Sequence, residues 1–334
     1  MHRVVVIGAG QMGFLHGGIV GGLSAPPIAM ADRDERLMGL ASKVLPSLHF
    51  YTDYTEMIRQ CDPTIVYVCV PPQNHLEVVS EVLALGKPNL ALFVEKPLAG
   101  NSRDADKLVA LAERASAVTM VGFQRRFLPT MTQAKSLLDS GVIGPVKFVK
   151  AHDFAGGHLS SGTGWRSRRG SGGATLEYGI HMIDLLVWFF GDAKCGSSST
   201  VKVVSSEVED YVNFSLMFEA GFPGFVDLGW SMRTYRGGDA LLEIHGERGA
   251  IAASEDYVTL YRDASENDLS GSPGFERTHW MRLHPKLRFY LGGVPNVLQD
   301  EYFLRCIDSG VRPQPDFASA AKVNRLIDAI LNCG

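Results

Sequence analysis

The fold is decided by residues 4–13, whose sequence is VVVIGAGQMG. Four consecutive apolar residues predict a buried β-strand, and the G-x-G-x-x-G run after them predicts a tight turn into a helix, which is how a Rossmann domain begins. Gly8 permits the turn, Gly10 lets the backbone approach a pyrophosphate, and Gly13 lets the helix pack close to the strand. The N-terminus of that helix then holds the phosphate, although an ordinary strand-to-helix turn is the alternative. The loop residues predicted to bind the cofactor are Gly8, Gly10, Gln11, Met12 and Gly13.

A second signal lies at Asp32, which follows the apolar strand predicted over residues 28–31. This is the spacing expected of a carboxylate that binds an adenosine ribose. Such a carboxylate accepts hydrogen bonds from the 2′- and 3′-hydroxyls and repels a 2′-phosphate, which favours NAD over NADP. Arg33 keeps NADP possible, because a neighbouring guanidinium tolerates the extra phosphate. The alternative is that Asp32 caps the helix predicted over residues 34–41.

The composition is that of a globular protein large enough for two domains. The 334 residues are 46% hydrophobic and 20% charged, with a net charge of −4 and no basic run among aromatics, so we expect no nucleic-acid partner. Five cysteines without a C-x-x-C pair fit reduced thiols. The chain begins with a strand rather than a signal peptide, and no apolar run is long enough to span a membrane. We therefore expect a cytoplasmic protein with no membrane partner.

Periodicity divides the chain into two domains. Residues 1–122 alternate short apolar runs with helical patterns, which predicts an α/β Rossmann domain with a parallel sheet and a ligand crevice at the carboxyl ends of its strands. Residues 123–334 contain strands of alternating hydrophobicity, notably 211–218 and 226–230, which predicts an α+β domain with an open, largely antiparallel sheet. This second domain is expected to bind substrate and to form the oligomer. Further helices are predicted over residues 74–85, 102–114, 127–138, 174–190, 297–308 and 318–331.

The predicted strand at residues 90–94 leads into Glu95-Lys96-Pro97. A strand end and a proline fix the backbone here, so Lys96 is delivered to the mouth of the sheet, where it can face a bound nicotinamide. There it can take a hydroxyl proton as hydride leaves the same carbon. A surface salt bridge between Glu95 and Lys96 is the alternative.

A second candidate lies in residues 172–184, GGATLEYGIHMID, which predict a glycine-rich entry into an apolar helix. Glu177, His181 and Asp184 are spaced i, i+4 and i+7, so on an α-helix they share one face. Three titratable groups on an apolar helix need partners. A core imidazole oriented by its helix neighbours is one alternative, and a zinc site is a weaker one, because no second histidine pair supplies the remaining ligands. We expect no metal.

These motifs occur together in an order that resembles the Gfo/Idh/MocA oxidoreductases, a family named for glucose-fructose oxidoreductase, inositol dehydrogenase and a rhizopine catabolism protein. The resemblance covers nearly the whole chain. It implies a Rossmann domain followed by an open mixed sheet, a nicotinamide cofactor, and oxidation or reduction at a carbon of a sugar, polyol or related carbinol. The motifs that carry it are residues 8–13, 71–75, 95–97, 121–127 and 172–184.

The resemblance also implies roles for individual residues. Lys96 and His181 would handle the proton, Glu95 and Pro97 would line the nicotinamide pocket, and Pro71 and His75 would lie near the cofactor. Many members of the family carry aspartate where this chain has Glu177. Its longer side chain leaves two roles open for Glu177, orienting His181 or contacting substrate.

Further substrate contacts are expected from two short segments. Gln124, Arg125 and Arg126 begin where the sixth strand should end, and an arginine there can grip a carboxylate or phosphate of the substrate. Equally, one of them can tie the two domains together. In resembling proteins the glycine-rich loop at residues 156–173 borders the active site, so Trp165 can stack on a sugar ring or on the nicotinamide, with Arg166 beside it, or it can pack at a domain interface. Residues 263–274 are expected to form a mobile surface loop.

The sequence thus predicts an NAD(P)-dependent dehydrogenase or reductase acting on a sugar, cyclitol or derivative. Two alternatives stay open: a redox-neutral glycosidase or lyase that returns the hydride to tightly held NAD, and a nicotinamide-binding regulator without turnover. The apolar open face of the second sheet predicts self-association, as a homodimer or homotetramer.

Overall fold

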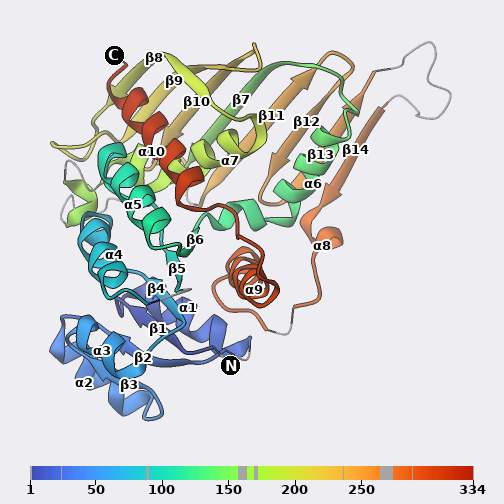
Figure 1. Ribbon diagram of the computed structural model, residues 1–334. Coiled ribbons are helices and arrows are strands. Elements are labelled where there is room, and N and C mark those ends of the chain that lie inside the picture. Colours follow the sequence, from blue (N-terminus) through green and yellow to red (C-terminus); the bar gives the residue numbers. More distant parts are fainter. Residues whose placement is uncertain are drawn as a thin grey trace. The chain divides into compact units, whose positions relative to one another are not determined.

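The computed structural model describes residues 2–23, 25–87, 90–156, 164–168, 172–235, 237–263, 274–287 and 289–333. It separates into two compact units (Figure 1). The first unit comprises Met1–Gln124 and Leu287–Asn324, and the second comprises Arg125–Lys286 and Arg325–Gly334. The sequence analysis placed all of residues 123–334 in one domain, whereas residues 287–324 belong to the first of these compact units.

The first unit contains a six-stranded parallel sheet with the order β3-β2-β1-β4-β5-β6. Both neighbours of β1 run parallel to it, and the connection direction reverses between β1 and β4, which is the switch point where ligands bind. The central strands are wholly buried, which explains their unbroken apolar runs. The Rossmann prediction is confirmed. The strands are β1 (Val4–Ile7), β2 (Pro27–Ala31), β3 (His49–Tyr51), β4 (Ile65–Val68), β5 (Ala91–Val94) and β6 (Val118–Val121).

The helices of the first unit include one that the sequence assigned to the other domain. Helix α9 (Val294–Ser309) packs against α1 (Gln11–Gly22). Gly18 of α1 leaves room for Leu291, which lies just before α9, since a Cβ on Gly18 would lie 2.6 Å from Leu291 Cδ2. The other helices are α2 (Glu35–Val44), α3 (Tyr54–Cys61), α4 (His75–Ala84) and α5 (Ser102–Arg114).

The second unit contains an eight-stranded sheet with the order β14-β13-β12-β11-β7-β10-β9-β8. Only β7 and β10 pair in parallel, and the two end strands do not meet in the order, so the sheet is open and largely antiparallel, as predicted. The strands are β7 (Val146–Phe154), β8 (Ala193–Val201), β9 (Tyr211–Phe218), β10 (Pro223–Gly229), β11 (Asp239–Gly246), β12 (Gly249–Ser254), β13 (Tyr257–Arg262) and β14 (Gly274–His279).

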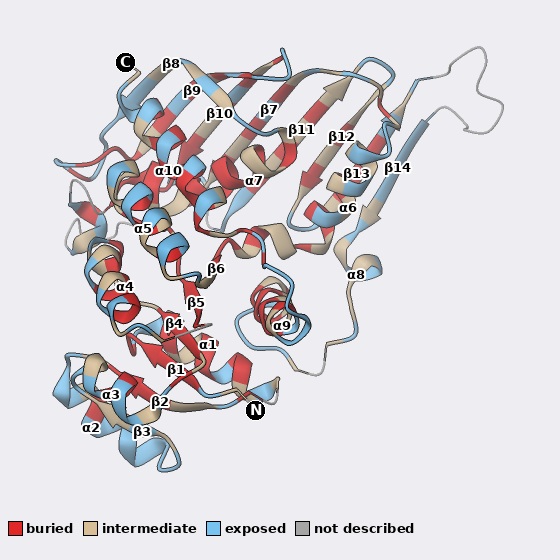
Figure 2. Ribbon diagram, viewed as in Figure 1, coloured by how far each residue is buried: buried red, intermediate tan, exposed pale blue. Residues whose placement is uncertain are grey.

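One face of this sheet is covered by helices. Helix α6 (Pro129–Asp139) contacts β12 and β13, and α7 (Ile180–Phe190) contacts β7 (Figure 1). Side chains of β9 alternate between buried and exposed accordingly, with Val212 and Phe214 inside and Met217 half exposed (Figure 2). The remaining helices are α8 (Trp280–Leu283) and α10 (Phe317–Leu331), whose residues fall in both units.

Two segments that resisted assignment fall mainly outside the described residues, namely 157–163 and 169–171 of the glycine-rich loop, and 264–273. Within the described ranges, a search for helices able to span a membrane finds none. The same part of the chain shows all five cysteines as free thiols.

Candidate active site

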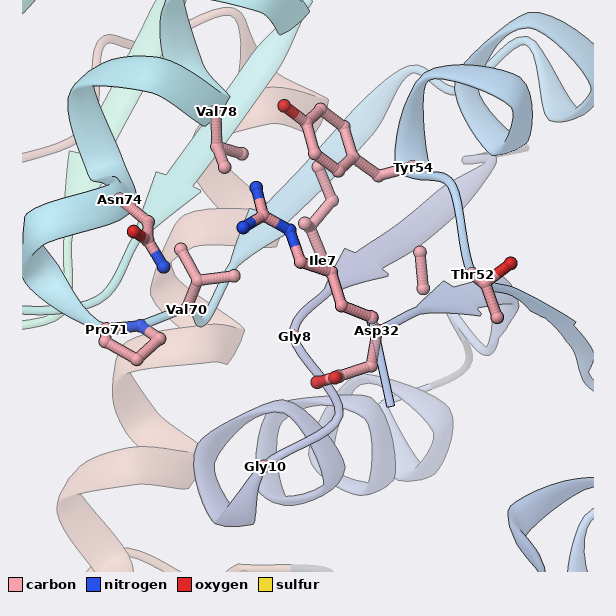
Figure 3. A pocket seen from close by; sticks show the side chains of 12 residues that line it. Ile7, Gly8, Gly10, Asp32, Thr52, Tyr54, Val70, Pro71, Asn74 and Val78 are labelled. Atoms are coloured by element: carbon pink, nitrogen blue, oxygen red, sulfur yellow. The ribbon is translucent and has the colours of Figure 1, made fainter. Parts of the chain in front are cut away.

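A cavity of about 320 Å³ lies in the first unit at the carboxyl ends of its strands, where the sequence predicted it (Figure 3). Figure 3 shows Pro71 and Asn74 on one side and Thr52 and Tyr54 on the other. Glycines and Asp32 form the part nearest helix α1. The lining residues are Ile7, Gly8, Gly10, Ala31, Asp32, Arg33, Thr52, Tyr54, Val70, Pro71, Asn74 and Val78.

The three glycines of the loop lie in different surroundings, and each leaves out a side chain for a different reason. Gly8 has a φ of +98°, and a Cβ there would lie 2.6 Å from the Cys69 carbonyl oxygen. A Cβ on Gly13 would lie 1.8 Å from the Gly8 oxygen, so helix and turn require glycine there. Around Gly10, by contrast, a Cβ would meet no described atom within 4 Å, and no side chain caps α1 there. Bare N–H groups with open space before them suit a pyrophosphate.

Asp32 braces the glycine loop as well as lining the cavity. Its Oδ2 accepts a hydrogen bond from the Ala9 N–H at 2.8 Å, and its Oδ1 accepts one from the Asp34 N–H at 3.0 Å. Asp34, rather than Asp32, caps helix α2 by accepting from the Leu37 N–H at 2.9 Å. The alternative in which Asp32 serves as the cap is therefore wrong.

Arg33 also lines the cavity, with its side chain largely exposed. Its Nη2 lies 3.2 Å from Glu77 Oε1, so the guanidinium already has an acidic neighbour. A cofactor 2′-phosphate would meet both that carboxylate and Asp32. This arrangement favours a cofactor without the phosphate.

The sequence analysis missed Thr52, Tyr54 and Asn74 as lining residues. Thr52 follows strand β3, so its position could have been found from the rule that ligands bind at carboxyl ends. Tyr54 donates a hydrogen bond to Glu81 Oε2 at 2.5 Å. Burial and that carboxylate raise the pKa of Tyr54, so its hydroxyl stays protonated.

His75 is fully buried and contacts the backbone of the turns that follow β4 and β5. Its Nδ1 lies 2.9 Å from the Pro97 oxygen, and its Nε2 lies 2.8 Å from the Val70 oxygen. Burial lowers the pKa of His75, and the hydrogen bonds to the backbone carbonyls oppose the effect. The ring joins the turns after β4 and β5, so its influence on a cofactor acts through Val70 and Pro97.

Glu95-Lys96-Pro97 follows β5, which pairs with β4, so these residues share the sheet edge that carries Val70 and Pro71. Lys96 is partly buried, and its N–H donates to Glu95 Oε2 at 3.2 Å. Glu95 is buried, and its Oε1 lies 2.9 Å from Nε2 of His16, a residue that the sequence analysis did not select. The alternative of an exposed Glu95–Lys96 salt bridge does not fit a buried Glu95.

In the second unit, Arg125 and Arg126 both form buried ion pairs. Arg125 binds both oxygens of Asp153, and its Nε lies 3.4 Å from Glu255. Arg126 holds Asp184 in a fork, with Nε to Oδ2 at 2.8 Å and Nη2 to Oδ1 at 2.6 Å. Burial raises the pKa of Asp153 and of Asp184, while the arginines oppose the effect.

Each guanidinium has two nitrogens on a carboxylate of its own unit, so both arginines already have an anionic partner. A contact of either arginine with a substrate anion stays a prediction. The carboxylates lie far away in the sequence, so the motif alone did not reveal them. Gln124 is the last residue of the first unit before this segment.

The predicted helix at residues 174–190 is divided. Residues Ala174–Gly179 form a π-helical turn, and α7 begins at Ile180. Glu177 therefore lies on the π-helical turn, whereas His181 and Asp184 lie on α7.

Glu177 accepts a hydrogen bond from Arg166 Nε at 3.1 Å, and the Arg166 guanidinium lies 5.1 Å from the centre of the Trp165 ring. The loop before α7 thus contributes both expected residues to one cluster with Glu177. His181 is buried at the first turn of α7. Lys96 belongs to the first unit and these residues to the second.

Over the described ranges, no group of three or more His, Cys, Asp or Glu side chains is arranged to hold a metal ion.

Two family models match the chain. One, described as an oxidoreductase family with an NAD-binding Rossmann fold, matches residues 2–123. The other, described as the GFO/IDH/MocA C-terminal domain, matches residues 131–252. Together they cover more than half of the chain.

Individual relatives agree with the models. The chain is 28% identical over 272 residues to a myo-inositol 2-dehydrogenase of Thermotoga maritima, covering 75% of each chain. It is 24% identical over 314 residues to a D-apiose dehydrogenase of Paraburkholderia graminis, covering 90% of this chain and 79% of that one. A solved levoglucosan dehydrogenase, in complex with NADH and levoglucosan, has a TM-score of 0.86 at 21% identity, covering 99% of this chain and 96% of that one, which shows a shared fold.

The open space at Gly10 generates a first prediction. A methyl group in Gly10→Ala meets no protein atom but occupies the approach to the pyrophosphate, so the protein should fold normally and bind NAD at least about tenfold more weakly. Gly21→Ala, later in the same helix and equally open, is the matched control and should leave affinity unchanged. Titration calorimetry measures both. Unchanged NAD affinity in Gly10→Ala would contradict the placement of the pyrophosphate.

The acidic surroundings of Arg33 generate a second prediction. NAD should bind at least about tenfold more tightly than NADP, because a 2′-phosphate would meet Asp32 and Glu77. In Asp32→Asn the preference should shrink, since the amide keeps the size of the side chain and removes its charge. Dissociation constants for both cofactors test this, and equal affinities in the unaltered protein would defeat the assignment.

Proposed function

This chain belongs to the Gfo/Idh/MocA oxidoreductases, with NAD as its cofactor, and we propose that it transfers a hydride between NAD and a carbinol or ketone carbon of a sugar, a cyclitol or a derivative of one. The names of its relatives support that substrate class, since they include dehydrogenases of myo-inositol and of D-apiose. NAD supplies the hydride acceptor, and NADP is the less favoured alternative.

The observation that carries the proposal is the arrangement of one sheet edge. The glycine loop and Asp32 lie at the ends of β1 and β2, while Pro71 and Lys96 follow the next strands of the same sheet, β4 and β5. Carboxyl ends of parallel strands face one crevice. Asp32 would hold the adenosine ribose of a dinucleotide and the loop at Gly10 would hold its pyrophosphate, while Lys96 follows a strand at the same edge of the sheet.

In this proposal Lys96 is the general acid and base. It takes the proton from the substrate hydroxyl as hydride leaves the same carbon, and it returns the proton in the reverse direction. Its backbone is held at a strand end by Glu95 and Pro97, so the side chain acts from a fixed base.

By the family motif, His181 would share the handling of the proton with Lys96 and would anchor the substrate. Glu177, held by Arg166 beside Trp165, contributes a carboxylate to a substrate hydroxyl rather than to the His181 ring. These assignments rest on the family motif and on the fixed positions of the side chains within their own unit.

Replacement of Lys96 tests the proposed role. Lys96→Met keeps the length of the side chain and removes the proton carrier, so turnover should fall on the order of 10²- to 10⁴-fold while NAD affinity changes little. Lys107→Met, on the exposed surface of α5, is the matched control and should retain turnover. Absorbance of NADH measures the rate with a panel of inositols, hexoses, sugar acids and sugar phosphates.

Each other outcome excludes part of the proposal. Equal turnover in the Lys96→Met and unaltered proteins would remove Lys96 from the mechanism. NAD that copurifies and shows no net reduction during turnover would indicate a redox-neutral glycosidase or lyase. Nucleotide binding without product from any compound would indicate a regulator.

The open sheet supports the proposal that the chain forms a homodimer or homotetramer. Large apolar side chains on the face opposite α6 and α7 are about half exposed, including Met217, Phe225, Tyr261 and Phe275. Exposed apolar area of this kind marks association surfaces. Sedimentation velocity at micromolar concentration should show an oligomer that Phe225→Glu weakens, and a monomer in the unaltered protein would contradict the proposal.

A further inference from the structure

A buried charged cluster in the first unit contains two residues, His16 and Asp300, that have no part in the mechanism above. His16 of α1 lies between two carboxylates, with Nδ1 2.8 Å from Asp300 Oδ2 and Nε2 2.9 Å from Glu95 Oε1. His16 and Asp300 are fully buried, and Glu95 is 7% exposed. The cluster joins three elements, since Asp300 belongs to α9 and Glu95 follows β5 (Figure 1).

Aromatic rings enclose the imidazole. The ring centre of Phe93 lies 4.8 Å from that of His16, and the ring centre of Tyr67 lies 5.5 Å away. Phe303, also on α9, packs against both rings. Faces of aromatic rings stabilise a neighbouring cation, and the low polarity strengthens every charge interaction inside.

The geometry decides the protonation of His16. A neutral imidazole donates through one nitrogen only, so the other would direct its lone pair at a carboxylate. An imidazolium donates to both carboxylates. Burial alone lowers the pKa of His16, but the charges and hydrogen bonds of Asp300 and Glu95 outweigh it and raise the pKa to about 10.

The cluster ends at Lys96. While Oε1 of Glu95 faces His16, its Oε2 accepts the hydrogen bond from the Lys96 N–H. A Cβ on Gly122 would lie 2.6 Å from Glu95 Oε1, so the neighbouring strand end leaves room for this carboxylate. A continuous series therefore runs from Asp300 through His16 and Glu95 to the backbone of Lys96.

We propose that His16 is a positioning residue for Lys96: as an imidazolium held by Asp300, it keeps Glu95 an oriented carboxylate, and Glu95 fixes the turn from which Lys96 projects. The role of Lys96 itself rests on the proposed function. Helix α1 also begins at the glycine loop, so the same contact sets the distance between the pyrophosphate site and the lysine. A buried ion cluster is costly compared with apolar packing, which points to a use other than stability.

The other titratable groups near His16 are Tyr67 and Cys69 from the β4 side, Glu95 and Lys96 from the turn after β5, and Asp300 from α9. Burial raises the pKa of Tyr67 and of Cys69 well above their ordinary values, so both stay neutral near pH 7. Burial also raises the pKa of Asp300, with His16 opposing the effect.

Asp300→Asn tests the proposal with almost no change of volume. The amide oxygen still accepts from Nδ1, but the negative charge that keeps His16 protonated is gone. In ¹⁵N NMR spectra, His16 of the unaltered protein should stay doubly protonated from about pH 6 to pH 9, whereas in Asp300→Asn it should titrate within that range.

The value of kcat should depend on whether His16 carries its second ring proton. In Asp300→Asn, kcat at pH 9 should fall about 10- to 100-fold, because a misplaced turn misplaces Lys96, and much of the loss should be recovered at pH 6 as His16 regains its proton. NAD affinity should stay within about threefold, since the glycine loop is unchanged. A merely structural role predicts no recovery at low pH.

Asp308→Asn is the matched control. It lies on the same helix and faces another histidine, with Oδ1 2.7 Å from His2 Nε2, but at the surface. It should leave kcat and its pH profile unchanged. Should Asp300→Asn fail to fold, Glu95→Gln removes the other carboxylate and should likewise make His16 titrate.

The outcomes separate this inference from the proposed function. Loss of a His16 ring proton between pH 6 and pH 9 in the unaltered protein would overturn the inference, as would a pH profile of Asp300→Asn equal to that of the unaltered protein. Neither result would change the fall in turnover expected for Lys96→Met, which tests the proposed function. Equal turnover with and without Lys96 would instead defeat the proposed function, whatever the NMR spectra show.

Discussion

The structure depends on how the glycine loop is fixed to the two strands beside β1. Gly8 N–H donates to the Ala31 oxygen at 2.8 Å, and Ala9 N–H donates to Asp32 at the same distance. On the other side, the absence of a Cβ lets Gly8 approach the Cys69 carbonyl. Because both neighbours hold the loop, the uncapped start of α1 faces the cavity at a fixed place, and every other element of the site is set relative to it.

The proton transfer proposed at this edge of the parallel sheet requires that Lys96 be held in as fixed a position as the glycine loop. The turn after β5 is supported from two sides, by His75 on the carbonyls of Pro97 and Val70 and by Glu95 in the His16 cluster. The two histidines thus contact opposite ends of the same short segment, residues 95–97. One joins backbone turns through carbonyl oxygens, and the other balances two buried carboxylates.

The sequence predicted what local patterns determine. The glycine loop, the parallel strands and the position of Asp32 follow from apolar runs and glycines, and the structure agrees. The sequence could not predict that residues 287–324 belong to the first unit, because the pattern of an amphipathic helix does not indicate which of two cores the helix joins. Strand β8 was missed because this edge strand is rich in serine and mostly exposed.

Within the candidate site, the sequence could not predict contacts between residues that are distant along the chain. The motif did not reveal that Arg125 pairs with Asp153 and that Arg126 pairs with Asp184. In the same way, the apolar helix that contains His16 did not reveal its pairing with Asp300.

Hydride transfer to NAD is tested most directly by isotope labelling, with a polyol substrate that carries deuterium on its carbinol carbon. The account predicts deuterium at C4 of the nicotinamide in the NADH formed; deuterium that stays with the product, with no labelled NADH, would contradict it.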